Sequence, residues 1–345
     1  MARATFWVSL ALTPVTLVVH YAFGVAGTPS FVLSAGALAP LAFLIGEATE
    51  DVAEHTGPGI GGFLNASFGN APELIIALFA VRSALPNVVR GSLAGSVVST
   101  ALLVLGGSMV AGGEGILDRS SLLLQIGMVL SAALCFLVPS IPGWQGNPER
   151  HELYVMTLPV AAALLAGYLA LTFFNLRRHA ASHQTDPGED ARSLKDGLAL
   201  LAAATVATAF VSEILVHSLD AFGHSLGLSQ FFVAAVIVAI VGNAAEQGGA
   251  VVIARRGNPR LGAEIAISSS AQVALFVTPA IAILSFLVGH DLPLSFRPVE
   301  LAAIAGAALV VGITVADRRS RRRKGIMLLV LYAAVVAAFG FAGDR

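Results

Sequence analysis

The chain has 345 residues, of which 56% are hydrophobic and 12% are charged, whereas ordinary soluble domains carry about 25% charged residues. A formal net charge of −1 excludes the strongly basic balance typical of nucleic-acid-binding proteins, and a single cysteine, Cys135, excludes an internal disulfide and a Cys-rich metal site. Because backbone polar groups in lipid must be satisfied within helices, this composition predicts an all-α integral membrane protein that contacts membrane lipid and no nucleic acid.

Taken in chain order, apolar runs of about 20 residues, the length that crosses a bilayer, predict eleven transmembrane helices. These helices lie near 5–25, 30–54, 62–82, 86–112, 120–140, 153–175, 197–222, 229–254, 261–288, 298–316 and 325–342. The glycine-rich "GPGIGG" at 57–62 predicts a flexible turn between the second and third helices. A polar cytoplasmic linker at 177–196 is predicted to separate an N-terminal helix (1–29) and a first five-helix unit (30–176) from a second five-helix unit (197–345).

The positive charges predict how these helices are oriented. If Arg3 lies in the cytoplasm and the helices alternate, fifteen of the twenty Lys and Arg residues fall on the cytoplasmic side, in agreement with the positive-inside rule. Six of the fifteen lie in "RRSRRRK" (318–324), which we interpret as a topology anchor. We therefore expect a cytoplasmic N-terminus, and the short N-terminus and compact linker fit a multi-pass protein of a prokaryotic plasma membrane.

One sequence motif occurs twice, at a constant offset of 173 residues. "ASFGNAPE" (66–73) aligns with "AIVGNAAE" (239–246), and "GSVVSTALLV" (95–104) aligns with "SSSAQVALFV" (268–277). Five predicted helices separate the copies, so the two enter the membrane from opposite sides. The sequence therefore predicts two inverted-topology repeats, the plan of many secondary transporters, with a binding site near the midplane where the repeats meet.

Each copy of the motif places a glutamate, Glu73 or Glu246, within an apolar span. A charged side chain at the bilayer centre costs about 2.5–3.5 kcal/mol on insertion scales. One interpretation is a glutamate neutralised by a hydrogen bond between helices. Recurrence of the same acid after Gly-Asn-Ala in both halves favours a second interpretation, in which the two glutamates form a cation site.

Other oxygen-bearing groups of the two motifs complete the predicted site. Gly69 and Gly242 weaken the helix and Pro72 removes a backbone donor, which turns carbonyl oxygens toward an ion. The further candidate ligands are the amides and hydroxyls of Asn70, Asn243, Ser96, Ser99, Ser269, Ser270 and Gln272. Such oxygens suit a hard cation such as Ca²⁺, which takes six to eight of them, although each hydroxyl alone is equally compatible with helix packing.

Two buried carboxylates also predict a coupling mechanism. An empty site with both groups ionised is unfavourable, because the charges repel one another and are desolvated. One divalent cation or two protons can neutralise it. If only the neutralised forms change their exposure, a proton gradient drives the cation in the opposite direction, which is antiport without enzyme chemistry and without a cofactor.

Acidic stripes on two other helices suggest routes to this site. In "GEATEDVAE", Glu47, Glu50 and two further acids share one helical face, and in the seventh helix Glu213 and His217 begin a similar stripe. We interpret Glu47, Glu50, Glu213 and His217 as ion or proton access or gating residues, with solvated helix ends as the alternative interpretation.

The motifs resemble those of the cation/proton exchangers (CAX) of the Ca²⁺/cation antiporter superfamily. The resemblance rests on "GGFLNASFGNAPELIIALFAVR" (61–82), "SEILVHSLDAFGHSLGLSQFFVAAVIVAIVGNAAE" (212–246) and "ISSSAQVALFVTP" (267–279). It implies export of Ca²⁺ in exchange for protons by alternating access, with Glu73 and Glu246 binding either ion and the second and seventh helices moving as gates. The family includes homo-oligomers, so the resemblance implies a trimer or a dimer.

Three residues depart from the family pattern, and they leave the choice of ion open. Gln247 stands where a histidine is usual, Thr100 where an asparagine is usual, and Ser268 where a glycine is usual. A Na⁺-coupled exchanger, either Na⁺/Ca²⁺ or Na⁺/H⁺, is therefore the alternative to a Ca²⁺/H⁺ exchanger. A passive cation channel lined by the same acids is less favoured, because it does not explain the inverted repeat.

Overall fold

Apolar helices make up nearly all of the structure, a computed structural model that describes residues 9–179 and 193–344. The first part of the chain forms α2 (Leu12–Tyr21), α3 (Thr28–Phe68), α4 (Ala71–Arg82), α5 (Pro86–Val98), the π-helix η1 (Ser99–Val104), α6 (Leu105–Gly112), the strand β1 (Gly115–Ile116), α7 (Arg119–Gly143) and α8 (His151–His179).

The second part of the chain begins with the longest helix of this half, α9 (Leu194–Leu226). It is followed by α10 (Gln230–Phe232), the π-helix η2 (Val233–Val238), α11 (Ala239–Gly242), α12 (Ala244–Arg255), α13 (Pro259–Gln272), the π-helix η3 (Val273–Val277), α14 (Thr278–Leu284), the 3₁₀ turn η4 (Ser285–Val288), α15 (Pro298–Val315), the strand β2 (Arg319–Ser320) and α16 (Arg322–Ala342).

The helices have the length and hydropathy of membrane spans. Within the described ranges, eight are long and apolar enough to cross a membrane, or nine if the bent pair Gln230–Gly242 and Ala244–Arg255 counts as one span. The helix at Leu12–Tyr21 is apolar but shorter. The start of the first expected helix (1–8) and most of the expected linker (180–192) lie outside the described residues.

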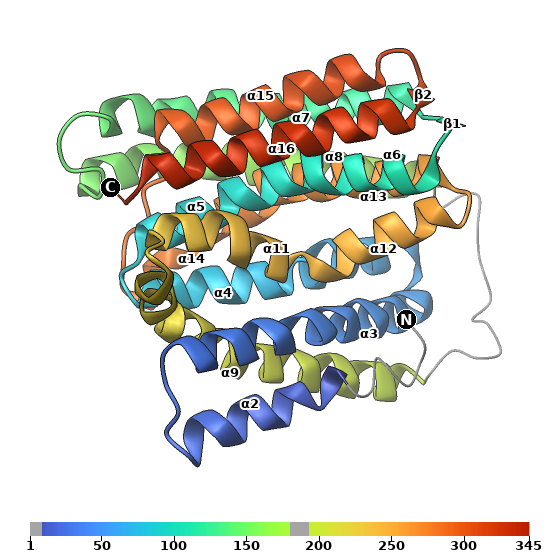
Figure 1. The fold of residues 1–345 in the computed structure, drawn as a ribbon. Helices are drawn as coiled ribbons and strands as arrows, with labels where there is room; N and C mark the ends of the chain where they lie inside the picture. Colours follow the sequence, from blue (N-terminus) through green and yellow to red (C-terminus); the bar gives the residue numbers. More distant parts are fainter. Residues whose placement is uncertain (1–8, 180–192, 345) are drawn as a thin grey trace.

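The expected turn at 57–62 is not an interruption of the helix. Helical backbone continues through these residues to Phe68. Glycine lowers helix propensity by about 1 kcal/mol but does not forbid helix, which explains why a glycine-rich run alone predicted a break wrongly. In Figure 1 the ribbon of α3 nevertheless turns back near its end and leads into α4.

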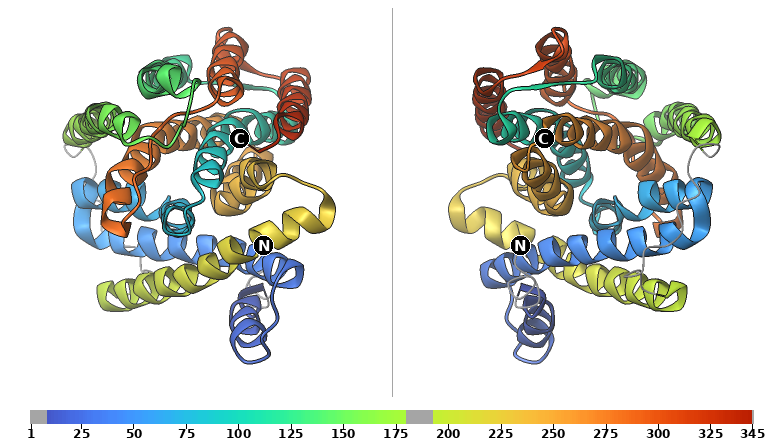
Figure 2. Two further views of the ribbon diagram at one scale, coloured as in Figure 1. Left: turned by 90° about the vertical axis from the view of Figure 1, so that its left-hand side faces the viewer. Right: turned by 90° about the vertical axis from the view of Figure 1, so that its right-hand side faces the viewer.

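The helices form layers around a buried centre. Figures 1 and 2 show α4, α5, α6, α11, α12 and α13 in the middle, α3 and α9 side by side on one flank with α2 outside them, and α7, α8, α15 and α16 on the other. In the most apolar window of Pro86–Gly112, 83% of the residues are buried, against 17% for Arg322–Ala342. The central helices therefore contact protein on most sides, whereas α16 presents most of its surface to the surroundings.

Matching elements of the two halves keep the offset found in the sequence. Helices α4 and α12 each have 12 residues and begin at Ala71 and Ala244, and the next helices begin at Pro86 and Pro259. A π-helix follows both of these helices. In Figure 1, α4 runs from the centre toward the left and α12 from the centre toward the right, so the two helices point in opposite directions.

Candidate cation site

Two helix breaks at the centre of the molecule define the site. The chain leaves helix at Gly69 and Asn70 before α4, and at Asn243 between α11 and α12, where the two helices are bent by 58°. Asn70 and Asn243 have almost the same backbone conformation, with φ and ψ of −101° and 13° in the first and −93° and 10° in the second. Each break leaves the first N–H groups of the next helix without a partner in the preceding turn, which makes this end of the helix polar.

The two glutamates lie in the first turns of the helices that follow these breaks. Glu73, in α4, is 7% exposed, and Glu246, in α12, is partly buried. Their charges are close enough to interact. The carboxyl of Glu73 lies against Gly242 of the other half, because a Cβ atom placed on Gly242 would be 3.5 Å from Glu73 Cδ.

Hydrogen bonds between the halves join the residues around the breaks. The amide nitrogen of Asn70 donates to Gln272 Oε1 at 2.8 Å. In the other half, the amide nitrogen of Asn243 donates to Ser96 Oγ at 2.9 Å. Each asparagine is thus held by a helix of the opposite half, α13 for Asn70 and α5 for Asn243, and the two breaks are brought to one place.

The remaining predicted ligands also lie on α5, η1 and α13. Ser99 is fully buried and donates to the backbone oxygen of Ser96 at 3.2 Å, and the hydroxyl of Ser269 lies beside the carboxylate of Glu246. The hydroxyls of Thr100 and Ser270 are 2.5 Å apart. Thr100, which departs from the family pattern, therefore takes part in the contact between the halves.

Buried oxygen atoms in this region lack hydrogen-bond donors. Among the described residues, no donor reaches Glu73 Oε2, Glu246 Oε2 or Asn243 Oδ1. The described part of the chain contains no group of three or more His, Cys, Asp or Glu residues able to hold a metal ion. The candidate site instead combines two carboxylates with amide and hydroxyl oxygens, a set that suits hard cations.

A small cavity of about 10 Å³ lies beside Glu73, between α4, α5 and α11. That is about the smallest cavity that can hold one water molecule. Ser92 lines it together with Ser96 and Gly242, and sequence reasoning missed Ser92. Its position one helical turn before Ser96, on the same face of α5, is the signal that could have identified it.

The predicted access residues lie on α3 and α9, which flank the central helices (Figure 1). Glu47 and Glu50 of α3 and His217 of α9 are exposed, and Glu213 of α9 is partly buried. His217 Nδ1 lies 2.8 Å from the backbone oxygen of Glu213. The structure places these residues on α3 and α9, the two helices that pack against each other on one flank (Figure 1).

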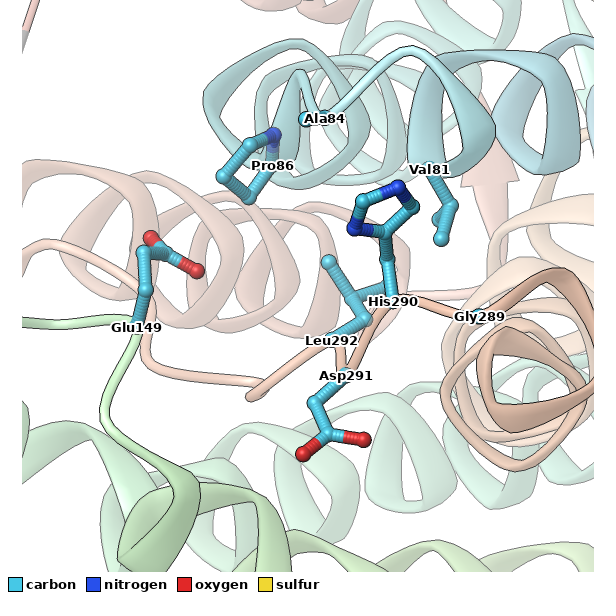
Figure 3. A pocket seen from close by; sticks show the side chains of 8 residues that line it. All are labelled: Val81, Ala84, Pro86, Glu149, Gly289, His290, Asp291 and Leu292. Carbon is cyan, nitrogen blue, oxygen red and sulfur yellow. The ribbon is translucent and has the colours of Figure 1, made fainter.

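A second, larger pocket of about 430 Å³ lies where α4 meets α5, beside residues 289–292 (Figure 3). Its acids already have partners: Asp291 bonds His151 at 2.5 Å, and Glu149 bonds the buried Arg90 at 2.6 Å. In Figure 3 the carboxylate of Asp291 points away from the ring of His290. We therefore assign the candidate cation site to the helix breaks.

The fold and the site together define a multi-pass integral membrane protein of the transporter class. Residues 27–177 and 197–341 match the family described as sodium/calcium exchanger protein. The chain belongs to this family, and the predicted resemblance to cation antiporters is confirmed.

Similar proteins cover nearly the whole chain. A Ca(2+)/H(+) antiporter of Synechocystis sp. is 33% identical over 97% of both proteins, and the Ca(2+)/H(+) antiporter ChaA of Bacillus subtilis is 35% identical over 87% of this chain and 88% of its own. The structure of native YfkE has a TM-score of 0.84 with 30% identity, covering 97% of this chain and 99% of that one. The H⁺/Ca²⁺ exchanger CAX, with a TM-score of 0.74 and 14% identity, shares the fold.

Proposed function

We propose that this chain is a secondary active antiporter that exports Ca²⁺ from the cytoplasm in exchange for protons. The observation that carries the proposal is the pair of glutamates, Glu73 and Glu246, placed by matching helix breaks of the two halves at one buried site. The names of the relatives from Synechocystis sp. and Bacillus subtilis support Ca²⁺ and protons as the exchanged ions.

The two glutamates provide the exchange by charge balance. One Ca²⁺ neutralises both carboxylates, and two protons do the same, whereas the empty ionised pair is disfavoured in a region with few compensating donors. Exchange follows when the site opens to the two sides alternately and changes sides only in a neutralised form. Helices α4 and α12 run in opposite directions (Figure 1), which supports two inverted repeats. We propose that these repeats belong to an eleven-helix plan with its N-terminus in the cytoplasm.

The cross-half hydrogen bonds support roles for the neighbouring residues as ligands. Asn243 uses its amide nitrogen to bond Ser96, so its oxygen is the atom that reaches toward an ion. Gly69, Pro72 and Gly242 lie at the breaks, where backbone oxygens can also ligate. The further ligands we propose are Asn70, Ser96, Ser99, Ser269 and Gln272.

The flank formed by α3 and α9 is proposed to gate the site. Small residues let these helices approach closely, since a Cβ atom on Gly197 would lie 3.2 Å from a methyl group of Val52. Polar side chains on both helices then line access routes for ions or protons from the two aqueous phases. These side chains are Glu47 and Glu50 on α3, and Glu213 and His217 on α9.

A flux assay tests the proposed function. Purified protein reconstituted in lipid vesicles with an imposed pH gradient is expected to accumulate Ca²⁺, and Glu73→Gln and Glu246→Gln are expected to abolish the uptake. Glu152→Gln is the matched control, because this glutamate is 81% exposed and lies at the start of α8, so the control should transport normally. Unchanged uptake by Glu73→Gln would refute the assigned site.

The family's description as sodium/calcium exchanger favours one second candidate, a Na⁺-coupled exchanger. Ca²⁺ uptake driven by a Na⁺ gradient at equal pH on both sides would decide for it. A passive channel through the same acids would carry Ca²⁺ only down its own gradient, so uptake against a Ca²⁺ gradient decides against a channel.

We also propose a prokaryotic plasma membrane as the location and a homo-oligomer, either a trimer or a dimer, as the assembly. The basic residues gathered at one end of the helices support the proposed orientation. Light scattering of the detergent-purified protein, corrected for bound detergent, distinguishes a monomer from a dimer or trimer.

A further inference from the structure

A basic surface covers one end of the helix bundle. We define this basic face by eight exposed arginines, namely Arg119, Arg255, Arg256, Arg318, Arg319, Arg321, Arg322 and Arg323. None of the eight forms an ion pair with another residue in the part of the chain that the structure describes. Neither the proposed exchange reaction nor the cation site uses these side chains.

Tertiary contacts gather these arginines from three separate segments. Strands β1 and β2 pair antiparallel, Gly115 with Ser320 and Ile116 with Arg319, at one end of the bundle in Figure 1. The hydroxyl of Ser320 also donates to the backbone oxygen of Gly113 at 2.8 Å. Gly115 in turn lies against the start of α13, because a Cβ atom there would be 2.4 Å from Pro259 Cγ.

The acids on this surface do not neutralise the basic face. Asp118 and Glu264 both pair with Arg260, at 2.7 and 3.0 Å, and Asp317 pairs with Lys324. Glu114 is the one further acid among the described residues of the connecting segments 113–118 and 316–321. Asp317, whose charge also acts on Arg321, and Glu114 are thus few acids against eight exposed arginines, which leaves this face with an excess of positive charge.

The start of α16 increases this excess of positive charge. The helix begins with Arg322, Arg323 and Lys324 and has no acidic residue in its first turn. Because a helix N-terminus carries a partial positive charge, anions stabilise this end and cations do not. Three basic residues at the N-terminus of α16 are therefore favourable only when negative charge comes from outside the chain.

Apolar side chains beside the basic face indicate the source of that negative charge. Ile116 on β1 is 79% exposed, and Ile313 near the end of α15 and Ile326 in the first turns of α16 are 77% and 52% exposed. Arginine and exposed aliphatic side chains therefore lie next to each other at the end of membrane-spanning helices. This pairing fits a lipid that has a charged headgroup and acyl chains, whereas a soluble polyanion would leave the aliphatic side chains in water.

We propose that the basic face binds anionic phospholipids of the surrounding membrane, with their phosphates on the arginines of the β1–β2 ribbon and the start of α16. Each basic residue near an anionic membrane surface contributes about a five-fold gain in affinity. The attraction falls with ionic strength, because the arginines are exposed and the Debye length shortens to about 8 Å at physiological salt.

Native mass spectrometry of the detergent-purified full chain tests the proposal. With equal amounts of phosphatidylglycerol and phosphatidylcholine added, we expect the protein to retain phosphatidylglycerol preferentially. The triple variant Arg321→Gln, Arg322→Gln, Arg323→Gln should lose this preference by at least about ten-fold and up to about one hundred-fold. The matched triple variant with lysine at the same three positions keeps the charges and should retain it.

Each other outcome overturns the proposal. Equal retention of the two lipids, or equal lipid preference in the glutamine variant and the wild type, would show that the basic face does not select anionic lipid. Displacement of the lipid by an equal concentration of glycerol phosphate would show that a soluble phosphate is the ligand. Because the assay measures binding without transport, its result does not depend on which ions the protein exchanges.

Discussion

Gly95 lies where two central helices of the opposite halves cross. A Cβ atom on Gly95 would lie 1.9 Å from the backbone oxygen of Ala235 in η2, and the same atom on Gly91 would lie 2.9 Å from the ring of Phe231. Gly91 and Gly95, which have the GxxxG spacing, therefore serve close packing between these helices.

Gly95→Ala is expected to separate the two helices and disrupt the site. Ordinary van der Waals contact begins at 3.4 Å, so α5 and η2 must part by about 1.5 Å. Overpacking of a core costs about 1–3 kcal/mol, and we expect at least the upper value here because the clash is with backbone, which cannot rotate away. A shift of this size would also break the hydrogen bond between Asn243 and Ser96, which is 2.9 Å long.

Thermal unfolding in detergent and Ca²⁺ uptake in vesicles measure the two effects of Gly95→Ala. We expect a clear fall in unfolding temperature and loss of uptake. Gly127→Ala is the control, because no atom lies within 4 Å of a Cβ placed there. If Gly95→Ala unfolds at the wild-type temperature and transports Ca²⁺ normally, the close crossing of α5 and η2 is refuted.

Three further predictions concern helix ends. Arg90→Met should lower the free energy of unfolding by about 3 kcal/mol, the low end for breaking a buried ion pair, because Arg90 is 1% exposed and Glu149, the charge left behind, is 31% exposed. A free energy of unfolding equal to that of the wild type would contradict this prediction. The hydroxyl of Ser120 chiefly holds the pKa of Asp118 below its ordinary value, and a carboxyl with a lowered folded-state pKa stabilises above its unfolded pKa and loses this effect as pH falls through the folded pKa. The stability difference between wild type and Ser120→Ala should therefore shrink on acidification, and a difference independent of pH would count against it. Finally, Asp344 accepts from the first two N–H groups of the helix that begins at α10, at 3.1 and 2.8 Å, so Asp344→Ala should cost about 1 kcal/mol; hydrogen exchange at these two amides should accelerate, and Asp344→Asn should behave more like wild type.

Several features of the fold followed from local sequence. Span length and hydropathy depend on consecutive residues, which is why most of the expected helices have counterparts in the structure. The family was recognisable because the motifs around Glu73 and Glu246 are short and contiguous. The sequence predicted that helical backbone would be interrupted at 57–62, and this was wrong, because glycine content lowers helix propensity without excluding helix; the ribbon of α3 nevertheless turns back near its end (Figure 1).

Contacts between distant segments could not be predicted in the same way. No local pattern joins Arg90 to Glu149. Glu47 and Glu50 are exposed on α3, and their role as access or gating residues stays a prediction, because the direction in which a helix face points depends on the helices that pack against it.

The sequence by itself determined that this protein consists of apolar helices, that its two halves carry the same motif 173 residues apart, and that each motif places a glutamate after a weak point in a helix. Only the tertiary structure decided which groups meet. It joined Asn70 to Gln272 and Asn243 to Ser96 across the halves. The physical reason is that helix formation and hydropathy are local properties, whereas a cation site needs side chains that are brought together only when the central helices pack.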